Sequence, residues 1–309
     1  MSSANRKPVT PGVAALRSAG TVLPGTPEVK DNKAREFEFT PADFEQVRKL
    51  IYDHAGIVLS ATRQDMVYSR LARRLRVYGD HSFSSYLGRL KTTKGEWEAF
   101  VNALTTNLTS FFRENHHFSL LINDLKRLAA EKRTIKIWCC AASTGEEPYS
   151  LAMTACEAFD SLTPPVQIFA SDIDTAVLAQ AKAGVYTRDR LESVPVERIR
   201  KFFQACPTEG EGAFRIRPEL QRLIQFSQVN LLDRLWPSIR GPVDIIFCRN
   251  VMIYFDKPTQ LAILKKFVPL LRPDGLLFVG HSESLLHAAD LFQSRGRTVY
   301  VRADTARMR

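Results

Sequence analysis

The chain has 309 residues, 45% of them hydrophobic, and a formal net charge of +10. This size suffices for one large hydrophobic core and a smaller second domain. No run of about 18 uncharged apolar residues occurs, and the N-terminus lacks the apolar core of a signal peptide, so we expect a soluble cytoplasmic protein without direct membrane insertion.

Residues 1 to 36 combine prolines and glycines with no apolar periodicity, which is typical of a disordered tail. Residues 37 to 110 are expected to form a small helical domain. Its first helix begins where Thr40 precedes Pro41, a typical N-cap and first-turn pair, and ends at Gly56. Three more helices are predicted at 62–78, 83–91 and 96–106.

The second of these helices carries a stripe of arginines that has two interpretations. Arg63, Arg70 and Arg74 share one helix face, and Arg73 is adjacent to Arg74. A basic stripe is often only a solvated face, but it is also what a docking surface for an acidic helical partner needs. The residues alone leave both interpretations open.

The segment from Asn107 to Arg113 places the apolar pair Phe111 and Phe112 between polar groups that could not be buried without partners. We expect the segment to face an active site. The alternative is a linker whose phenylalanines fill the interface between two domains.

No metal site is predicted. His116 and His117 follow on a helix, where neighbouring side chains point about 100° apart, so we expect them not to chelate one metal. The five cysteines form no C-x-x-C pair and have no zinc-ligand spacing to a histidine, which indicates reduced thiols.

The most informative stretch lies between Ile137 and Asp172. An apolar run is followed by a turn of small and acidic residues at 143–147, a helix-like segment and a second apolar run. This order is typical of a strand, turn, helix and strand that bind a nucleotide. An acid at the end of the second strand, here Asp172, can accept hydrogen bonds from the ribose hydroxyls.

The turn narrows the choice of cofactor. Gly145 is its only glycine, whereas a dinucleotide fingerprint needs the G-x-G-x-x-G pattern, and Glu146 and Glu147 at a helix N-terminus would repel a pyrophosphate. A cationic adenosine derivative such as S-adenosylmethionine (SAM) fits better. The alternative is an ordinary strand-to-helix connection capped by Ser143 or Thr144.

The remaining sequence continues the alternation expected of an α/β fold with a doubly wound, mostly parallel sheet. Strands are predicted at 224–229, 243–248 and 276–279, with a helix at 257–271 and a turn at 272–275. In open α/β sheets, ligands bind beyond the carboxyl ends of the strands. The polar residues at such ends are Glu147, Asp172, Asn230, Arg249 and Asn250.

Four blocks, at 107–114, 142–150, 170–174 and 247–255, read NLTSFFRE, ASTGEEPYS, ASDID and FCRNVMIYF. With these blocks the chain resembles, from Phe39 to Val301, the CheR family of bacterial chemotaxis-receptor glutamate methyltransferases. The resemblance implies a Rossmann-like methyltransferase domain at 111–309 and a receptor-docking helical domain. It also implies methyl transfer from SAM to glutamate side chains on cytoplasmic chemoreceptor helices, with S-adenosylhomocysteine as product.

The resemblance also implies which residues form the site. The cofactor-binding positions are Asn107, Thr109, Arg113, Glu147, Asp172, Asn230, Leu231, Cys248, Arg249 and Asn250. Arg113 and Tyr254 are the positions that the family places nearest the reacting methyl group, and we expect them to be catalytic. Glu147 is favoured over Glu146 only by its family position.

Two surfaces for partners follow from the resemblance. It favours the docking interpretation of Arg63, Arg70, Arg73 and Arg74, which would attract acidic methylation regions of receptors. It also predicts a small β subdomain at 203–225, which in some members binds a receptor C-terminal peptide; the alternative is a plain surface hairpin. The protein would associate with membrane receptor arrays through its substrate.

Two other function classes remain. The net charge suggests a nucleic-acid methyltransferase, but Arg249-Asn250-Val251-Met252 stands where exocyclic amine methylation commonly uses Asn/Asp-Pro-Pro-aromatic. No basic groove with interleaved aromatic residues occurs either, so we expect no nucleic-acid partner. A catalytically silent cofactor sensor is the second class, and the presence of Arg113 and Tyr254 gives no reason to favour it.

Overall fold

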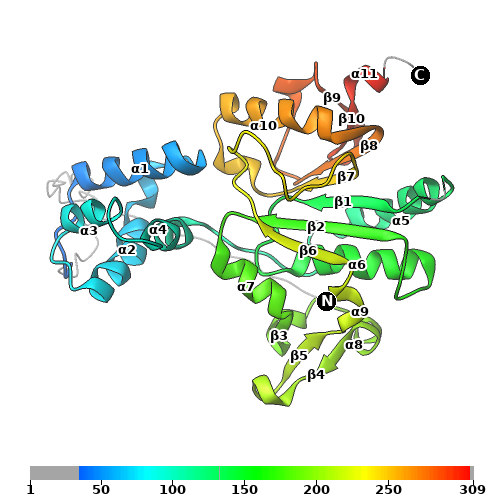
Figure 1. The fold of residues 1–309 in the computed structure, drawn as a ribbon, viewed down its shortest axis with the longest axis horizontal. Helices are drawn as coiled ribbons and strands as arrows, with labels where there is room; N and C mark the ends of the chain where they lie inside the picture. Colours follow the sequence, from blue (N-terminus) through cyan, green and yellow to red (C-terminus); the bar gives the residue numbers. More distant parts are fainter. Residues whose placement is uncertain (1–34, 132, 307–309) are drawn as a thin grey trace, which may run out of the picture. The chain divides into compact units, whose positions relative to one another are not determined.

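Seven strands form the main sheet of the computed structural model, which describes residues 35–131 and 133–306 (Figure 1). They are β1 Ile135–Cys139, β2 Val166–Asp172, β6 Ile224–Gln228, β7 Val243–Cys248, β8 Leu271–Val279, β9 Phe292–Gly296 and β10 Val299–Arg302. Their spatial order is β6-β2-β1-β7-β8-β10-β9. The strands from β6 to β8 in this order pair in parallel, whereas β10 is antiparallel to both of its neighbours. The predicted α/β fold with a doubly wound, mostly parallel sheet is confirmed.

Helices cover both faces of this sheet. They are α5 His116–Ala129, α6 Glu146–Phe159, α7 Thr175–Ala183 and α10 Lys257–Leu270. Successive residues of a strand point to opposite faces, so Ile137 and Phe247 pack in one core with α5 and α6, whereas Trp138 and Ile246 pack in the other with α10. In the sheet, β2 lies on one side of β1 and β7 lies on the other, so the connections that leave these strands diverge. A crevice therefore opens between the carboxyl ends of β1 and β7.

The predicted turn at 272–275 is wrong, because these residues belong to β8. Leu271 and Leu276 pair with Val243 and Ile245, so the four residues between the two leucines bulge opposite a single residue of β7. The proline and glycine that suggested a turn therefore mark a bulge inside a strand.

Four helices form the N-terminal domain: α1 Pro41–Ala55, α2 Gln64–Tyr78, α3 Phe83–Arg89 and α4 Glu96–Leu104. The hydroxyl of Thr40 accepts the backbone N–H of Asp43, and the Asp43 carboxylate accepts the backbone N–H of Thr40, which starts α1 where predicted. The 3-10 helix η1, Ala61–Arg63, delays the start of α2 by two residues relative to the prediction. One apolar core joins the four helices. The predicted tail at 1–36 lies outside the described residues, apart from its last two.

Two of the four arginines predicted to dock a partner contact the helical domain itself. Nε and Nη2 of Arg74 donate to the two carboxylate oxygens of Glu96, which is buried. Nη1 of Arg70 donates to two backbone carbonyls at the end of α4. Arg63 and Arg73 are exposed. The stripe is therefore divided into a structural pair and a solvent-facing pair.

A second, antiparallel sheet is made of β3 Val185–Thr187, β4 Phe203–Ala205 and β5 Ala213–Ile216, in the order β3-β5-β4. It begins earlier in the chain than the predicted range of 203–225, and the last residues of that range already belong to β6. Because β3 has three residues and a partner that is distant in sequence, no local pattern marks it. The short helices of this region are η2 Arg188–Leu191, α8 Val196–Phe202, η3 Pro207–Glu209 and α9 Pro218–Gln221.

The remaining elements are η4 Met252–Tyr254, η5 Leu286–Ala288 and α11 Ala303–Ala306. Within residues 35–131 and 133–306, no helix combines the length and the apolar composition that crossing a membrane requires.

Candidate active site

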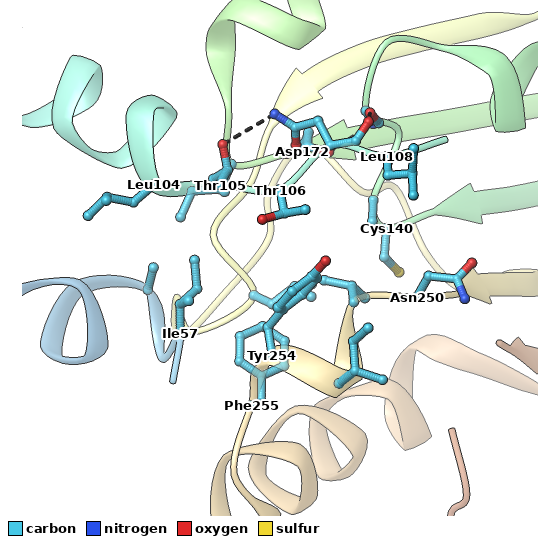
Figure 2. Close-up of a pocket in the computed structure, with 18 of the residues that line it drawn as sticks. Ile57, Leu104, Thr105, Thr106, Leu108, Cys140, Asp172, Asn250, Tyr254 and Phe255 are labelled. Carbon is cyan, nitrogen blue, oxygen red and sulfur yellow. Dashed lines mark hydrogen bonds between the residues drawn. The ribbon is translucent and has the colours of Figure 1, made fainter. Parts of the chain in front are cut away.

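A cavity of about 350 Å³ opens at the carboxyl ends of β1, β2, β6 and β7, the edge where ligands bind in open α/β sheets. The helical domain and the segment after α4 also contribute to its wall. Asp172, Cys140 and Tyr254 lie around it (Figure 2). Pockets for small molecules have volumes of roughly 300–1,000 Å³ and few polar groups, so this cavity is suited to a cofactor.

Asp172 ends β2 beside the cavity and is 8% exposed. Its Oδ2 accepts the backbone N–H of Ser143 at 2.8 Å, and its Oδ1 accepts that of Asp174 at 3.0 Å. Burial raises the pKa of the Asp172 carboxyl to about 6, although these hydrogen bonds act in the opposite direction. The two backbone bonds fix the carboxylate and leave lone pairs that can accept hydroxyl groups of a ligand.

A buried arginine, Arg249, connects three segments of the site. Its Nη1 donates to Oε2 of Glu147 at 2.8 Å. Its Nη2 donates to the backbone carbonyl of Arg113 at 2.5 Å and lies 3.3 Å from Oε2 of Glu114. Its Nε has no hydrogen-bond partner among the described residues. Burial raises the pKa of Glu147, although the charge of Arg249 acts against this.

Glu283 holds the loop that follows β7, a role that the sequence did not predict. Its Oε2 accepts the backbone N–H of Asn250 at 2.8 Å and that of Gly280 at 2.6 Å, and its Oε1 accepts that of Ile253 at 3.4 Å. These bonds hold Asn250 at a φ of 58°, in the left-handed region, and position η4, which carries Tyr254. Glu283 is 4% exposed, and burial raises its pKa. Extending the search for acids to the carboxyl end of β8 would have found it.

Glu114 is a second residue whose role the sequence did not reveal. Its carboxylate contacts Arg249, Nδ2 of Asn250 at 3.3 Å and Nδ1 of His281 at 2.9 Å. Burial acts to raise the pKa of Glu114, but the hydrogen bond from His281 and the charge of Arg249 outweigh it and lower the pKa to about 2. Glu114 is therefore ionised at neutral pH and balances the charge of Arg249.

The helical domain contributes directly to the site. The backbone N–H of Val58 donates to the carbonyl of Tyr254 at 2.8 Å. Nδ2 of Asn230 donates to the carbonyl of His54 at 2.7 Å, and its Oδ1 accepts the N–H of Leu232 at 2.9 Å. Nδ2 of Asn230 thus joins the two domains, whereas its Oδ1 bond stays within the loop after β6. The residue also lines the cavity.

Most of the predicted site residues meet in this cavity. Its lining includes Asn107, Thr109, Arg113, Glu147, Asp172, Asn230, Leu231, Arg249, Asn250 and Tyr254. Cys248 is an exception: its side chain is buried in the core beside α10, and Cys140 lines the cavity instead. Of the four predicted docking arginines, only Arg63 lines the cavity. The individual roles of these residues stay predictions.

The geometric argument against a shared metal at His116 and His117 is wrong. Their ring centroids lie 4.2 Å apart. With Glu114, their ligand atoms gather within 4.8 Å. The same Glu114 carboxylate contacts Arg249, whose positive charge disfavours a cation at this cluster. The absence of a metal stays a prediction.

Comparison with known proteins gives family matches on both domains. The CheR methyltransferase all-alpha domain matches residues 42–105, and the CheR methyltransferase SAM binding domain matches residues 107–301. The chain is 52% identical to chemotaxis protein methyltransferase 2 of Pseudomonas aeruginosa, over 86% of this chain and 95% of that protein. It is 49% identical to the chemotaxis protein methyltransferase of Escherichia coli, over 84% of this chain and 90% of that protein. A probable chemotaxis protein methyltransferase of Rhizobium etli is 39% identical, over 81% of this chain and 96% of that protein.

The raised pKa of Asp172 predicts that cofactor binding depends on pH. As the pH falls through about 6, the carboxyl gains a proton and accepts ligand hydroxyl groups less well. We expect the affinity for SAM, measured by titration calorimetry, to fall about tenfold between about pH 7 and about pH 5. Asp172→Asn should bind SAM about tenfold more weakly at neutral pH, with this dependence lost. A wild-type affinity for SAM that stays constant down to pH about 5 would contradict the role of Asp172 in binding. If the affinity of Asp172→Asn still falls with pH, the dependence belongs to Glu147.

Replacing Glu283 by glutamine tests whether the loop after β7 must be held in place. The amide presents N–H groups to backbone N–H donors, so a buried donor loses its partner at a cost of about 1–3 kcal/mol. We expect Glu283→Gln to lower turnover about tenfold, and much less in a Tyr254→Phe background, because Tyr254 is the residue of this loop that we predict to be catalytic. Glu197→Gln, at an exposed position of α8, is the control. Equal losses in both backgrounds would mean that Glu283 only stabilises the fold.

Proposed function

Because the chain belongs to the CheR methyltransferase family, we propose that it methylates glutamate side chains of chemoreceptors and forms glutamyl methyl esters. The chain is a chemotaxis methyltransferase with a SAM-binding domain. One observation carries the finer proposal. A single cavity combines buried acids suited to a cationic cofactor with Arg113 and Tyr254, which are suited to an acceptor carboxylate.

The residues of the cavity fit SAM. We infer that Asp172 accepts the ribose hydroxyls and that Glu147, which is 8% exposed and lines the cavity, binds the ammonium group. Arg249, whose side chain is buried, holds the Glu147 carboxylate in place for this contact. Val229 and Leu231 offer apolar surface for the adenine ring. When bound, the cofactor supplies an electrophilic methyl group on a sulfonium centre.

The acceptor carboxylate needs orientation rather than deprotonation. A glutamate side chain has an ordinary pKa of about 4.3 and is already an ionised nucleophile at neutral pH. The protein has to hold a carboxylate oxygen about 3–3.5 Å from the methyl carbon, on the side opposite the sulfur. Alignment of this kind can lower the barrier by up to about 7–11 kcal/mol.

Arg113 and Tyr254 are suited to this task. Arg113 is half-buried at the cavity, and its Nη1 donates to the carbonyl of Leu108 at 2.9 Å, which leaves further N–H groups for a carboxylate. Tyr254 extends into the same cavity (Figure 2). We infer that Arg113 orients the acceptor and that the Tyr254 hydroxyl hydrogen-bonds it or lines the path of the methyl group.

Arg113 should orient the acceptor without holding it tightly. The negative charge of the carboxylate is neutralised as the new bond forms, so a tightly paired arginine would stabilise the ground state as much as the transition state. A half-buried guanidinium suits this requirement, because solvent weakens its charge interactions.

We propose that receptor helices approach the cavity beside the exposed arginines Arg63 and Arg73 of a docking domain at 37–110. Their charges favour acidic methylation regions, and added salt should weaken this attraction. The small antiparallel sheet is the proposed site for a receptor C-terminal peptide. Binding of this kind would bring the protein to receptor arrays.

Incubation with radiolabelled SAM and membranes that carry chemoreceptors tests the proposal. Label on the receptor that base releases as methanol would identify a carboxyl methyl ester. Cofactor binding without transfer to the receptor would favour a sensor, and label that resists base would indicate a different acceptor group.

Replacing Arg113 by alanine should lower the rate of ester formation at least about tenfold, or about 1.4 kcal/mol, with little loss of stability. The side chain is half-buried, and the backbone carbonyl that Arg249 contacts remains in the variant. Initial rates at saturating cofactor and the free energy of unfolding in urea check both parts. Arg200→Ala, at an exposed position of α8, is the matched control. A folded Arg113→Ala protein with wild-type turnover would refute the role.

A further inference from the structure

Three exposed apolar side chains lie at the entrance of the cavity. Leu108 is 79% exposed, Ile253 is 50% exposed and Val58 is 44% exposed, and all three line the cavity. We call them the apolar rim. Eight large hydrophobic side chains are exposed in the part of the chain that the structure describes, and three of the eight belong to the rim. Apolar groups that gather in water beside a functional cavity indicate a binding surface.

The backbone of each rim residue is fixed by a hydrogen bond from the site. The N–H of Val58 donates to the carbonyl of Tyr254 at 2.8 Å. The carbonyl of Leu108 accepts the Nη1–H of Arg113 at 2.9 Å. The N–H of Ile253 donates to Oε1 of the buried Glu283 at 3.4 Å. The exposure of the rim is therefore built into the loops that carry the site.

Charge distinguishes the entrance from the interior of the cavity. The acids suited to the cofactor, Asp172 and Glu147, are each 8% exposed and lie inside. Arg63 and Arg113 line the cavity with the rim, and Arg63 is exposed. The entrance thus combines apolar and basic groups. Its complement is a segment that carries a carboxylate between apolar side chains.

We propose that the apolar rim binds the apolar side chains that flank the acceptor glutamate on a chemoreceptor helix, a proposal that rests on the function proposed above. Residues three and four positions apart on a helix share a face, with Cβ atoms about 5–6 Å apart. A glutamate that enters the cavity therefore brings its neighbours at these spacings to the entrance. The rim selects glutamates with apolar neighbours there and rejects equally acidic ones that lack them.

The test compares two enzyme variants on two acceptors. Leu108→Ser combined with Ile253→Ser removes most of the rim, and Leu235→Ser, whose side chain is 74% exposed and does not line the cavity, is the matched control. One acceptor is a receptor cytoplasmic fragment. The other is the same fragment with serine in place of the apolar residues three and four positions from the target glutamate. Titration calorimetry gives the affinity of each variant for SAM.

We expect the rim variant to raise KM for the natural fragment at least about tenfold, with unchanged SAM affinity, and to show no such penalty on the serine-flanked fragment. Leu235→Ser should match the wild type. An unchanged KM, or an equal penalty on both fragments, would overturn the proposal. Weaker SAM binding by the rim variant would also overturn it, because the rim would then belong to the cofactor site. A wild-type protein that forms no ester on either fragment would overturn the proposed function itself, an outcome distinct from any change in KM.

Discussion

The site depends on a guanidinium buried inside the protein. A buried charge is tolerated only where it is paired, and Arg249 is 3% exposed. Glu147 and Glu114 neutralise it, and the backbone carbonyl of Arg113 accepts one of its N–H groups. Glu147 belongs to the start of α6, and Arg113 and Glu114 belong to the segment before α5. Arg249 therefore anchors both of these segments to the end of β7. Arg249 thereby sets the place from which the Arg113 side chain reaches the cavity.

The residues that hold the site differ from those proposed to act on the acceptor. Glu283 fixes the loop after β7, and Val58 binds the backbone of Tyr254. Arg113 and Tyr254 themselves are half-buried. This division suits a methyl transfer that needs alignment but no proton transfer. It also makes the helical domain a structural part of the site, in addition to any docking role.

Local patterns predicted the parallel strands and the polar residues at their carboxyl ends, including Arg249. Arg113 and Tyr254 required the family resemblance, because neither residue type at these positions has a local signature. Partners that are distant in sequence could not be predicted. Helical spacing placed Arg74 on a face but could not reveal its pairing with Glu96. The proline and glycine after α10 suggested a turn and could not reveal that β8 already pairs with β7 before them, at Leu271.

A double-mutant cycle on Arg249 and Glu147 tests most directly whether this ion pair organises the site. The free energy of unfolding in urea would be measured for Arg249→Met, Glu147→Gln and the combined variant. Removing one partner of a buried pair costs about 3–5 kcal/mol, because it leaves the other charge unpaired. We predict that the combined variant is more stable than the sum of the single losses implies, by at least about 1 kcal/mol. Additive losses would contradict the claim that the two residues act as a pair.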